Sequence, residues 1–145
     1  MKTSMKATSV APSNIAFIKY WGKKKDPKLR LPENGSISMN LSNLLTTTTV
    51  EFKDSFTTDE IIFNGKQEDT AGNRAIMHLD RIRALAKIKT KAKIITENNF
   101  PTGTGLSSSA SGFAALTLAA SAVAGLDLSK KELSILARQG SGSAC

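Results

Sequence analysis

The sequence has very few of the residues that build covalent or metal-based sites. Its 145 residues include one cysteine and one histidine. A single cysteine, Cys145, excludes a disulfide framework within the chain, and we expect a reducing, cytoplasmic location. With His78 as the only histidine, a zinc cluster of His and Cys ligands is excluded as well. We therefore assign no metal ligands, and we expect a structural role for His78.

Long apolar runs are also missing. No stretch approaches the roughly 18 apolar residues that a membrane-spanning helix needs, and residues 1–10 lack the apolar core of a secretion signal. Hydrophobic residues make up 40% of the chain and charged residues 22%, which is typical of a globular domain. The sequence therefore predicts one compact domain over residues 1–145, without a membrane partner.

Acidic residues are outnumbered by basic ones, 12 to 20, which gives a net charge of +8. This excess suits an acidic partner such as nucleic acid, an anionic surface or a phosphorylated small molecule. Basic residues gather between positions 74 and 93, namely Arg74, Arg81, Arg83, Lys87, Lys89, Lys91 and Lys93. No aromatic residues alternate with them, as stacking on single-stranded nucleic acid requires. We predict a solvated face here, and an RNA-binding module is the less favoured alternative.

The order of predicted elements is typical of an α+β domain. Strands are predicted at residues 6–11, 36–41, 46–52 and 60–63, with turns at Pro12-Ser13-Asn14 and Asn64-Gly65. Helices are predicted at 71–87, at 111–124 and after 127–129, and a further strand at 91–97. In the strand at 36–41, apolar Ile37, Met39 and Leu41 alternate with polar residues, which predicts a half-buried strand. Strands followed by helix, strand, helix and helix favour α+β.

The most informative stretch is the loop Pro-Thr-Gly-Thr-Gly-Leu-Ser-Ser-Ser-Ala at residues 101–110, between a predicted strand and an apolar helix. Its glycines allow backbone N–H groups to converge on an anion, and its serines add hydroxyl donors. It is not a Walker-type loop, because no Lys-Ser/Thr pair follows the second glycine, and it lacks the third glycine of a dinucleotide fingerprint. The loop predicts a phosphate or polyphosphate site; a serine-capped glycine turn without a ligand is the alternative.

Two further runs are unusual: Asn-Ile-Ala-Phe-Ile-Lys-Tyr-Trp-Gly-Lys at 14–23 and Gly-Ser-Gly-Ser-Ala-Cys at 140–145. Together with the loop at 101–110, they resemble the diphosphomevalonate decarboxylases, a family within the GHMP kinase superfamily. The loop alone indicates the superfamily, whereas Lys-Tyr-Trp-Gly-Lys is specific to the decarboxylase branch. The resemblance implies an α+β GHMP-kinase N-terminal lobe (ribosomal protein S5 domain 2-like). We expect this lobe to be truncated at its C-terminal end and incomplete without the C-terminal lobe.

The resemblance also implies an activity. Members of the family use ATP and Mg²⁺ to convert mevalonate 5-diphosphate to isopentenyl diphosphate through transient phosphorylation of the 3-hydroxyl, with loss of CO₂. It further implies a cytoplasmic homodimer with no nucleic-acid or membrane partner. The alternative is another GHMP small-molecule kinase, acting on mevalonate or mevalonate 5-phosphate. Because the family's catalytic aspartate, and an arginine that follows the cysteine, would lie beyond Cys145, we expect the 145-residue chain alone to be inactive.

Individual roles follow from the resemblance by matching positions. The catalytic positions, near the substrate hydroxyl and carboxylate, are Asn14 and Lys19. The substrate-binding positions are Tyr20, Lys23, Ser141, Gly142 and Ser143. The ATP-phosphate-binding positions are Gly103, Gly105, Leu106, Ser107, Ser108 and Ser109. These roles agree with the chemistry, because catalysis of phosphoryl transfer consists mainly of positioning and charge neutralisation.

Overall fold

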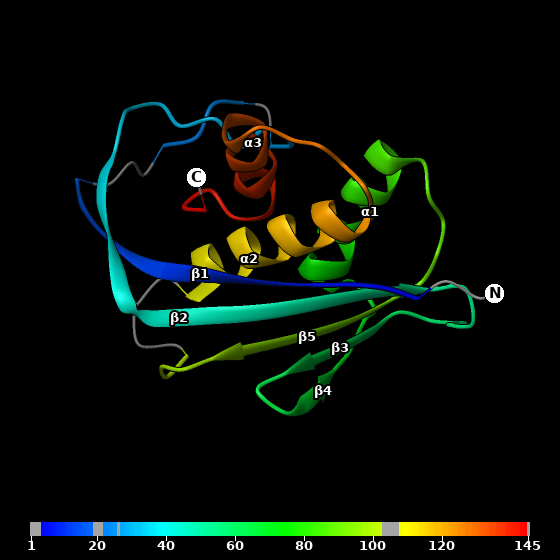
Figure 1. The fold of residues 1–145 in the computed structure, drawn as a ribbon. Coiled ribbons are helices and arrows are strands. Elements are labelled where there is room, and N and C mark those ends of the chain that lie inside the picture. Colours follow the sequence, from blue (N-terminus) through cyan, green and yellow to red (C-terminus); the bar gives the residue numbers. More distant parts are fainter. Residues whose placement is uncertain (1–3, 19–21, 26, 103–107, 145) are drawn as a thin grey trace.

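A five-stranded sheet carries three helices on one face, as the computed structural model of residues 4–18, 22–25, 27–102 and 108–144 shows (Figure 1). The strands are β1 (Ser4–Ile18), β2 (Ile37–Lys53), β3 (Glu60–Phe63), β4 (Lys66–Glu68) and β5 (Ala92–Asn98). The helices are α1 (Arg74–Ala86), α2 (Ser108–Val123) and α3 (Lys130–Gly140). The strand order is β1-β2-β5-β3-β4, with β3 and β5 parallel and the other pairs antiparallel. The predicted α+β class is confirmed.

The predicted turn at Pro12-Ser13-Asn14 is wrong, because β1 continues through it as a strand of 15 residues. β1 lies at the edge of the sheet, where a proline is tolerated since it has no N–H to donate. The register shifts here instead: Pro12 pairs with Leu45, whereas Ser13 pairs with Leu41. The proline therefore marks an irregularity within a strand and not the end of one.

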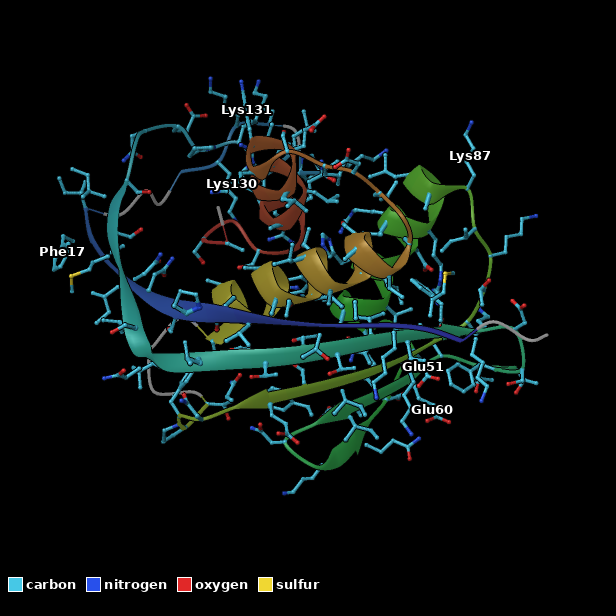
Figure 2. All side chains as sticks on the ribbon, in the orientation of Figure 1. Phe17, Glu51, Glu60, Lys87, Lys130 and Lys131 are labelled. Carbon is cyan, nitrogen blue, oxygen red and sulfur yellow. The ribbon has the colours of Figure 1, made fainter. Side chains whose placement is uncertain are left out.

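The strands predicted at 36–41 and 46–52 form a single strand, β2. The predicted half-burial of its first part is wrong as well, since Ile37 and Met39 are 60% and 51% exposed. This part pairs with the end of β1 in a two-stranded ribbon that extends past the start of α2 (Figure 1). Phe17, 66% exposed, lies at the outer edge of the ribbon (Figure 2). Alternation alone did not reveal that none of the three described helices covers this region (Figure 1).

The predicted hairpin turn between β3 and β4 is confirmed. Asn64 and Gly65 both have positive φ, 47° and 77°, as a two-residue turn between twisted antiparallel strands requires. The three residue pairs that follow, from Phe63–Lys66 to Ile61–Glu68, complete the short hairpin. The start of α3 is also as expected: Ser129 caps the helix in a reciprocal capping box with Glu132.

The core lies between the sheet and α2, and α2 is as apolar and as buried as its sequence predicts. Small residues on its inner face, such as Ala115 and Ala119, let the helix lie close to the strands. The approach is close enough for the Ser9 hydroxyl of β1 to donate to the Ala115 carbonyl. The larger side chains of the core come from the sheet, α1 and α2, namely Val50, Phe52, Ile61, Leu79, Ile82, Ile94, Phe113 and Leu116.

The predicted solvated basic face is wrong at Arg83, which is buried with 6% of its surface exposed. Its guanidinium forms two hydrogen bonds with the Asp59 carboxylate, one of them 3.1 Å long, and lies over the Phe52 ring. Nearby, Lys91 and Lys93 form ion pairs with Asp59 and Glu60, at 3.7 and 3.4 Å. Part of the basic charge is therefore neutralised locally.

Asp59 joins the start of β3 to α1 and β5, because its carboxylate also accepts from the Ala92 amide at 2.8 Å. Burial alone would raise the pKa of Asp59. The hydrogen bonds from Arg83 and the Ala92 amide, with the charges of Arg83 and Lys91, outweigh burial and lower the pKa below its ordinary value of 3.8.

No helix among the residues that the structure describes is long and apolar enough to span a membrane.

We predict that Asp59→Asn lowers the free energy of unfolding at pH 7 by about 3–5 kcal/mol, because it leaves a buried guanidinium without its charge partner. A carboxyl whose folded pKa is lowered stabilises the fold above its unfolded pKa and stops doing so as the pH falls through the folded value. The gap between wild type and variant should therefore close below about pH 3.8. Urea unfolding at pH 7 and pH 3 measures both effects.

Asp80→Asn is the matched control. Asp80 also contacts Arg83, at 2.8 Å, but its side chain is 62% exposed. An exposed ion pair contributes about 0–1 kcal/mol, so this variant should unfold almost as the wild type does. Equal losses in the two variants would contradict the importance of the buried pair.

Candidate functional site

The amino end of α2 is the centre of the candidate site. Ser108 and Ser109 form its first turn, where backbone N–H groups have no acceptor within the helix and the helix dipole is positive. The Thr46 hydroxyl of β2 donates to Asn98 Oδ1, so it accepts from the buried Ser111 hydroxyl of α2 at 2.7 Å. The helix starts three residues before the predicted Ser111, and the hydrogen bond to β2 holds its first turn.

A turn after α3 lies beside this helix end. Ser141 caps α3 and is buried, and the Ala144 amide donates to the Ser141 carbonyl at 2.9 Å. The Ser141 hydroxyl lies 3.4 Å from those of both Ser109 and Ser143. On the other side, Asn14 Nδ2 of β1 donates to the Ser143 carbonyl at 3.2 Å. Hydroxyl and amide groups from three distant parts of the chain thus converge on one small surface.

The structure brings together four of the residues to which the sequence assigned phosphate or substrate contacts: Asn14, Ser109, Ser141 and Ser143. Ser108 and Gly142 are their immediate chain neighbours. Lys23 lies exposed where residues 22–24 pair with residues 31–33, and it makes no hydrogen bond or ion pair with these groups among the described residues. The remaining predicted site residues are outside the described part of the chain: Lys19, Tyr20, Gly103, Gly105, Leu106 and Ser107.

A cavity of about 230 Å³ opens beside Ser108 and Ser109. Its walls are mainly apolar. The lining residues are Thr48, Ile61, Phe63, Ala75, Ile94, Thr96, Asn98, Ser108, Ser109, Gly112, Phe113 and Leu116. Among the residues that the structure describes, no neighbour lies within 4 Å of the position that a Cβ on Gly112 would take, so this glycine leaves space open.

Asn98 supplies an unused donor at the cavity. Its Oδ1 accepts from Thr46 Oγ1 at 2.7 Å, whereas its buried Nδ2 has no protein partner among the described residues. A buried amide donor without an acceptor is unfavourable, and a ligand acceptor would satisfy it. The sequence analysis missed this residue, although an asparagine that ends the strand leading into the predicted loop could have drawn attention to it.

His78 contacts Phe113, one of the residues that line the cavity. The Thr117 hydroxyl donates to the Phe113 carbonyl at 2.6 Å, so it accepts from His78 Nε2 at 2.8 Å, and Nδ1 carries no proton. Burial, aided by the nearby Arg81 charge, lowers the pKa of His78 to about 4. The neutral ring packs edge-on against Phe113, with centroids 5.4 Å apart. These contacts agree with the structural role expected for His78.

Comparison with known sequences gives one consistent family. The sequence model of the diphosphomevalonate decarboxylase-like N-terminal domain matches residues 11–145. Diphosphomevalonate decarboxylase mvd1 of Aspergillus fumigatus is 44% identical over 160 residues, covering 99% of this chain and 39% of the relative. The diphosphomevalonate decarboxylase of Homo sapiens is 42% identical, covering 95% of this chain and 38% of the relative. The chain therefore spans about 40% of the length of these relatives.

Solved structures give the same result. Mevalonate diphosphate decarboxylase from Staphylococcus aureus superimposes with a TM-score of 0.91 at 42% identity, covering 98% of this chain and 43% of that chain. MDDEF in complex with MVAPP, AMPPCP and magnesium also gives a TM-score of 0.91 at 42% identity, covering 99% of this chain and 44% of that chain. The α+β fold described above is therefore the fold of the N-terminal part of these enzymes.

We predict that Gly140→Ala destabilises the protein by about 1–3 kcal/mol, the usual range for overpacking. A Cβ at Gly140, the last residue of α3, would lie 2.8 Å from two ring carbons of Phe113, so α3 would have to move. Gly112→Ala is the comparison, because a Cβ at Gly112 would contact no described residue. Alanine within a helix is more stable than glycine by about 0.5–1 kcal/mol, so this variant should be stabilised. Thermal unfolding should show opposite shifts, and a stabilised Gly140→Ala would refute this packing.

Proposed function

Because the chain belongs to the diphosphomevalonate decarboxylase-like N-terminal domain family, we propose that it forms the ATP- and substrate-binding part of a diphosphomevalonate decarboxylase. The proposed reaction consumes ATP and mevalonate 5-diphosphate and yields ADP, inorganic phosphate, CO₂ and isopentenyl diphosphate. The observation that carries the proposal is the convergence of Asn14, Ser109 and the turn Ser141–Ser143 at the amino end of α2.

This surface is suited to bind phosphate groups. Free N–H groups at a helix start and several hydroxyls offer hydrogen-bond donors to phosphate oxygens, and the helix dipole favours negative charge. We assign Ser108 and Ser109, with the loop at 103–107, to the ATP phosphates. The turn Ser141–Ser143, with Tyr20 and Lys23, is assigned to the substrate diphosphate. An overall charge of +8 favours the approach of two polyanions.

Asn14 and Lys19 are assigned to the substrate hydroxyl and carboxylate. Asn14 is held by its donation to the Ser143 carbonyl, so its Oδ1 stays available to accept a hydrogen bond from the substrate hydroxyl. That geometry would orient the hydroxyl oxygen toward the transferring phosphoryl group, which is the main requirement of phosphoryl transfer. The catalytic aspartate of the family is expected outside these 145 residues.

The cavity beside Ser108 and Ser109 fits the nucleoside part of ATP. Its apolar walls suit a heterocyclic base, and Asn98 Nδ2 offers a donor that no described protein group uses. The triphosphate would then extend from the cavity toward the amino end of α2. Mg²⁺ would be coordinated by the phosphate oxygens. The described residues include no group of three or more His, Cys, Asp or Glu side chains placed to hold a metal.

The finer assignments concern assembly and location. We propose a cytoplasmic homodimer: the family resemblance supports the dimer, and the single cysteine supports a reducing compartment. Sedimentation of the native protein would measure its oligomeric state, and fractionation of the source cells would show its compartment.

The deciding experiment measures ADP and CO₂ together from mevalonate 5-diphosphate, ATP and Mg²⁺, using the native protein that carries this chain. Equal amounts of both products are expected. ADP without CO₂ would reject the decarboxylase in favour of a kinase. Absence of both products, with mevalonate 5-diphosphate and with mevalonate 5-phosphate as substrate, would reject the proposal altogether.

We predict that Gly112→Leu weakens ATP binding by about tenfold or more but leaves binding of inorganic tripolyphosphate within about twofold. The leucine side chain would occupy the cavity that we assign to the nucleoside, without displacing any protein atom at its Cβ. Ala122→Leu, on the exposed side of the same helix, is the matched control and should bind both ligands as the wild type does. Isothermal titration of both probes measures the difference, and equal weakening for both would place the nucleoside elsewhere.

A further inference from the structure

Arg74, the first residue of α1, contacts two other helices beside the candidate site. Its Nη2 donates to the carbonyl of Gly140 at 2.7 Å, and its guanidinium carbon lies 5.2 Å from the centroid of the Phe113 ring. Carbonyl groups in the last turn of a helix have no N–H donor within the helix, and a cation there also complements the negative end of the dipole. Neither contact belongs to any role assigned above.

The acceptor of this hydrogen bond is next to the phosphate-binding turn. Gly140 directly precedes Ser141, whose hydroxyl faces Ser109, and Asn14 holds the far end of the turn at the Ser143 carbonyl. The turn is thus held at one end by Arg74 and at the other by Asn14. Phe113 limits movement between them, because no space remains between its ring and Gly140.

We propose that Arg74 is a positioning residue for the turn Ser141–Ser143, and that it sets the affinity of this turn for a diphosphate group. Arg74 acts through the Gly140 carbonyl and the Phe113 ring, not through contact with the reacting atoms. The affinity part of this proposal rests on the proposed function, whereas the positioning part depends only on the contacts of the free protein.

Three variants test the positioning part. Arg74→Met removes the donor and the charge but keeps an unbranched side chain. Arg74→Lys keeps the charge and can still donate to the Gly140 carbonyl. Lys87→Met removes a lysine at the far end of α1, where its side chain points into solvent (Figure 2). Because Arg74 is itself exposed, Arg74→Met should fold and unfold much as the wild type does.

The first measurement is amide hydrogen exchange in the free protein, at the Ser141 and Ala144 amides. These amides donate to the carbonyls of Ala137 and Ser141, at 3.1 and 2.9 Å, so they report opening of the turn. Arg74→Met should accelerate exchange at both amides by about tenfold, with the β5 amides unchanged, while Arg74→Lys and Lys87→Met stay near wild type. Unchanged exchange in Arg74→Met would overturn the proposal.

The second measurement is the affinity for mevalonate 5-diphosphate and for ATP, by titration of the native protein and its variants. Arg74→Met should lower the affinity for mevalonate 5-diphosphate by about tenfold and the affinity for ATP by less than about twofold. Arg74→Lys should keep most of the wild-type affinity for mevalonate 5-diphosphate. A loosened turn with unchanged affinity would overturn the assigned role of Arg74 in binding. If the wild type binds neither ligand, the proposed function fails, and hydrogen exchange alone decides the positioning part.

Discussion

The close approach of α2 to β1 and β2 is the constraint on which the remaining structure depends. Alanines and serines on its inner face let the Ser9 hydroxyl reach the backbone of the helix at Ala115, and let Ser111 contact Thr46. A helix held this closely by its own backbone has little freedom to slide or tilt. Its amino end therefore lies at a defined place beside β1, and the turn after α3 is packed against that end through Phe113 and Gly140.

Much of the fold could be predicted, because local chemistry determines it. The Asn64-Gly65 turn, the Ser129 cap and the apolar composition of α2 each depend on neighbouring residues. The errors arose where a distant part of the chain decides the outcome. Pro12 stays in a strand because β2 continues alongside it, and Arg83 is buried because Asp59, 24 residues away, neutralises it.

The candidate site divides in the same way. The family resemblance pointed to Asn14, Ser109, Ser141 and Ser143, and the fold brings these residues together. Residues that support them had no motif to mark them. Arg74 looked like one more solvent-exposed cation on a helix. The open space at Gly112, and an Asn98 donor that no described protein group uses, are properties of the assembled cavity. Supporting contacts of this kind depend on tertiary geometry, which short patterns do not encode.

The hydrogen bond between Asn14 and Ser143 joins residues 129 positions apart in the sequence. A ribosome releases a domain from its amino end, and domains fold as they emerge. The pairing of β1 with β2 needs only the first 53 residues, and α2, which supplies several core side chains, ends at residue 123. The surface assigned to phosphate cannot exist until the turn after α3 has also emerged. During synthesis this segment therefore acquires most of its core before it acquires any ability to recognise a ligand, so the nascent chain must reach that stage without help from ligand binding.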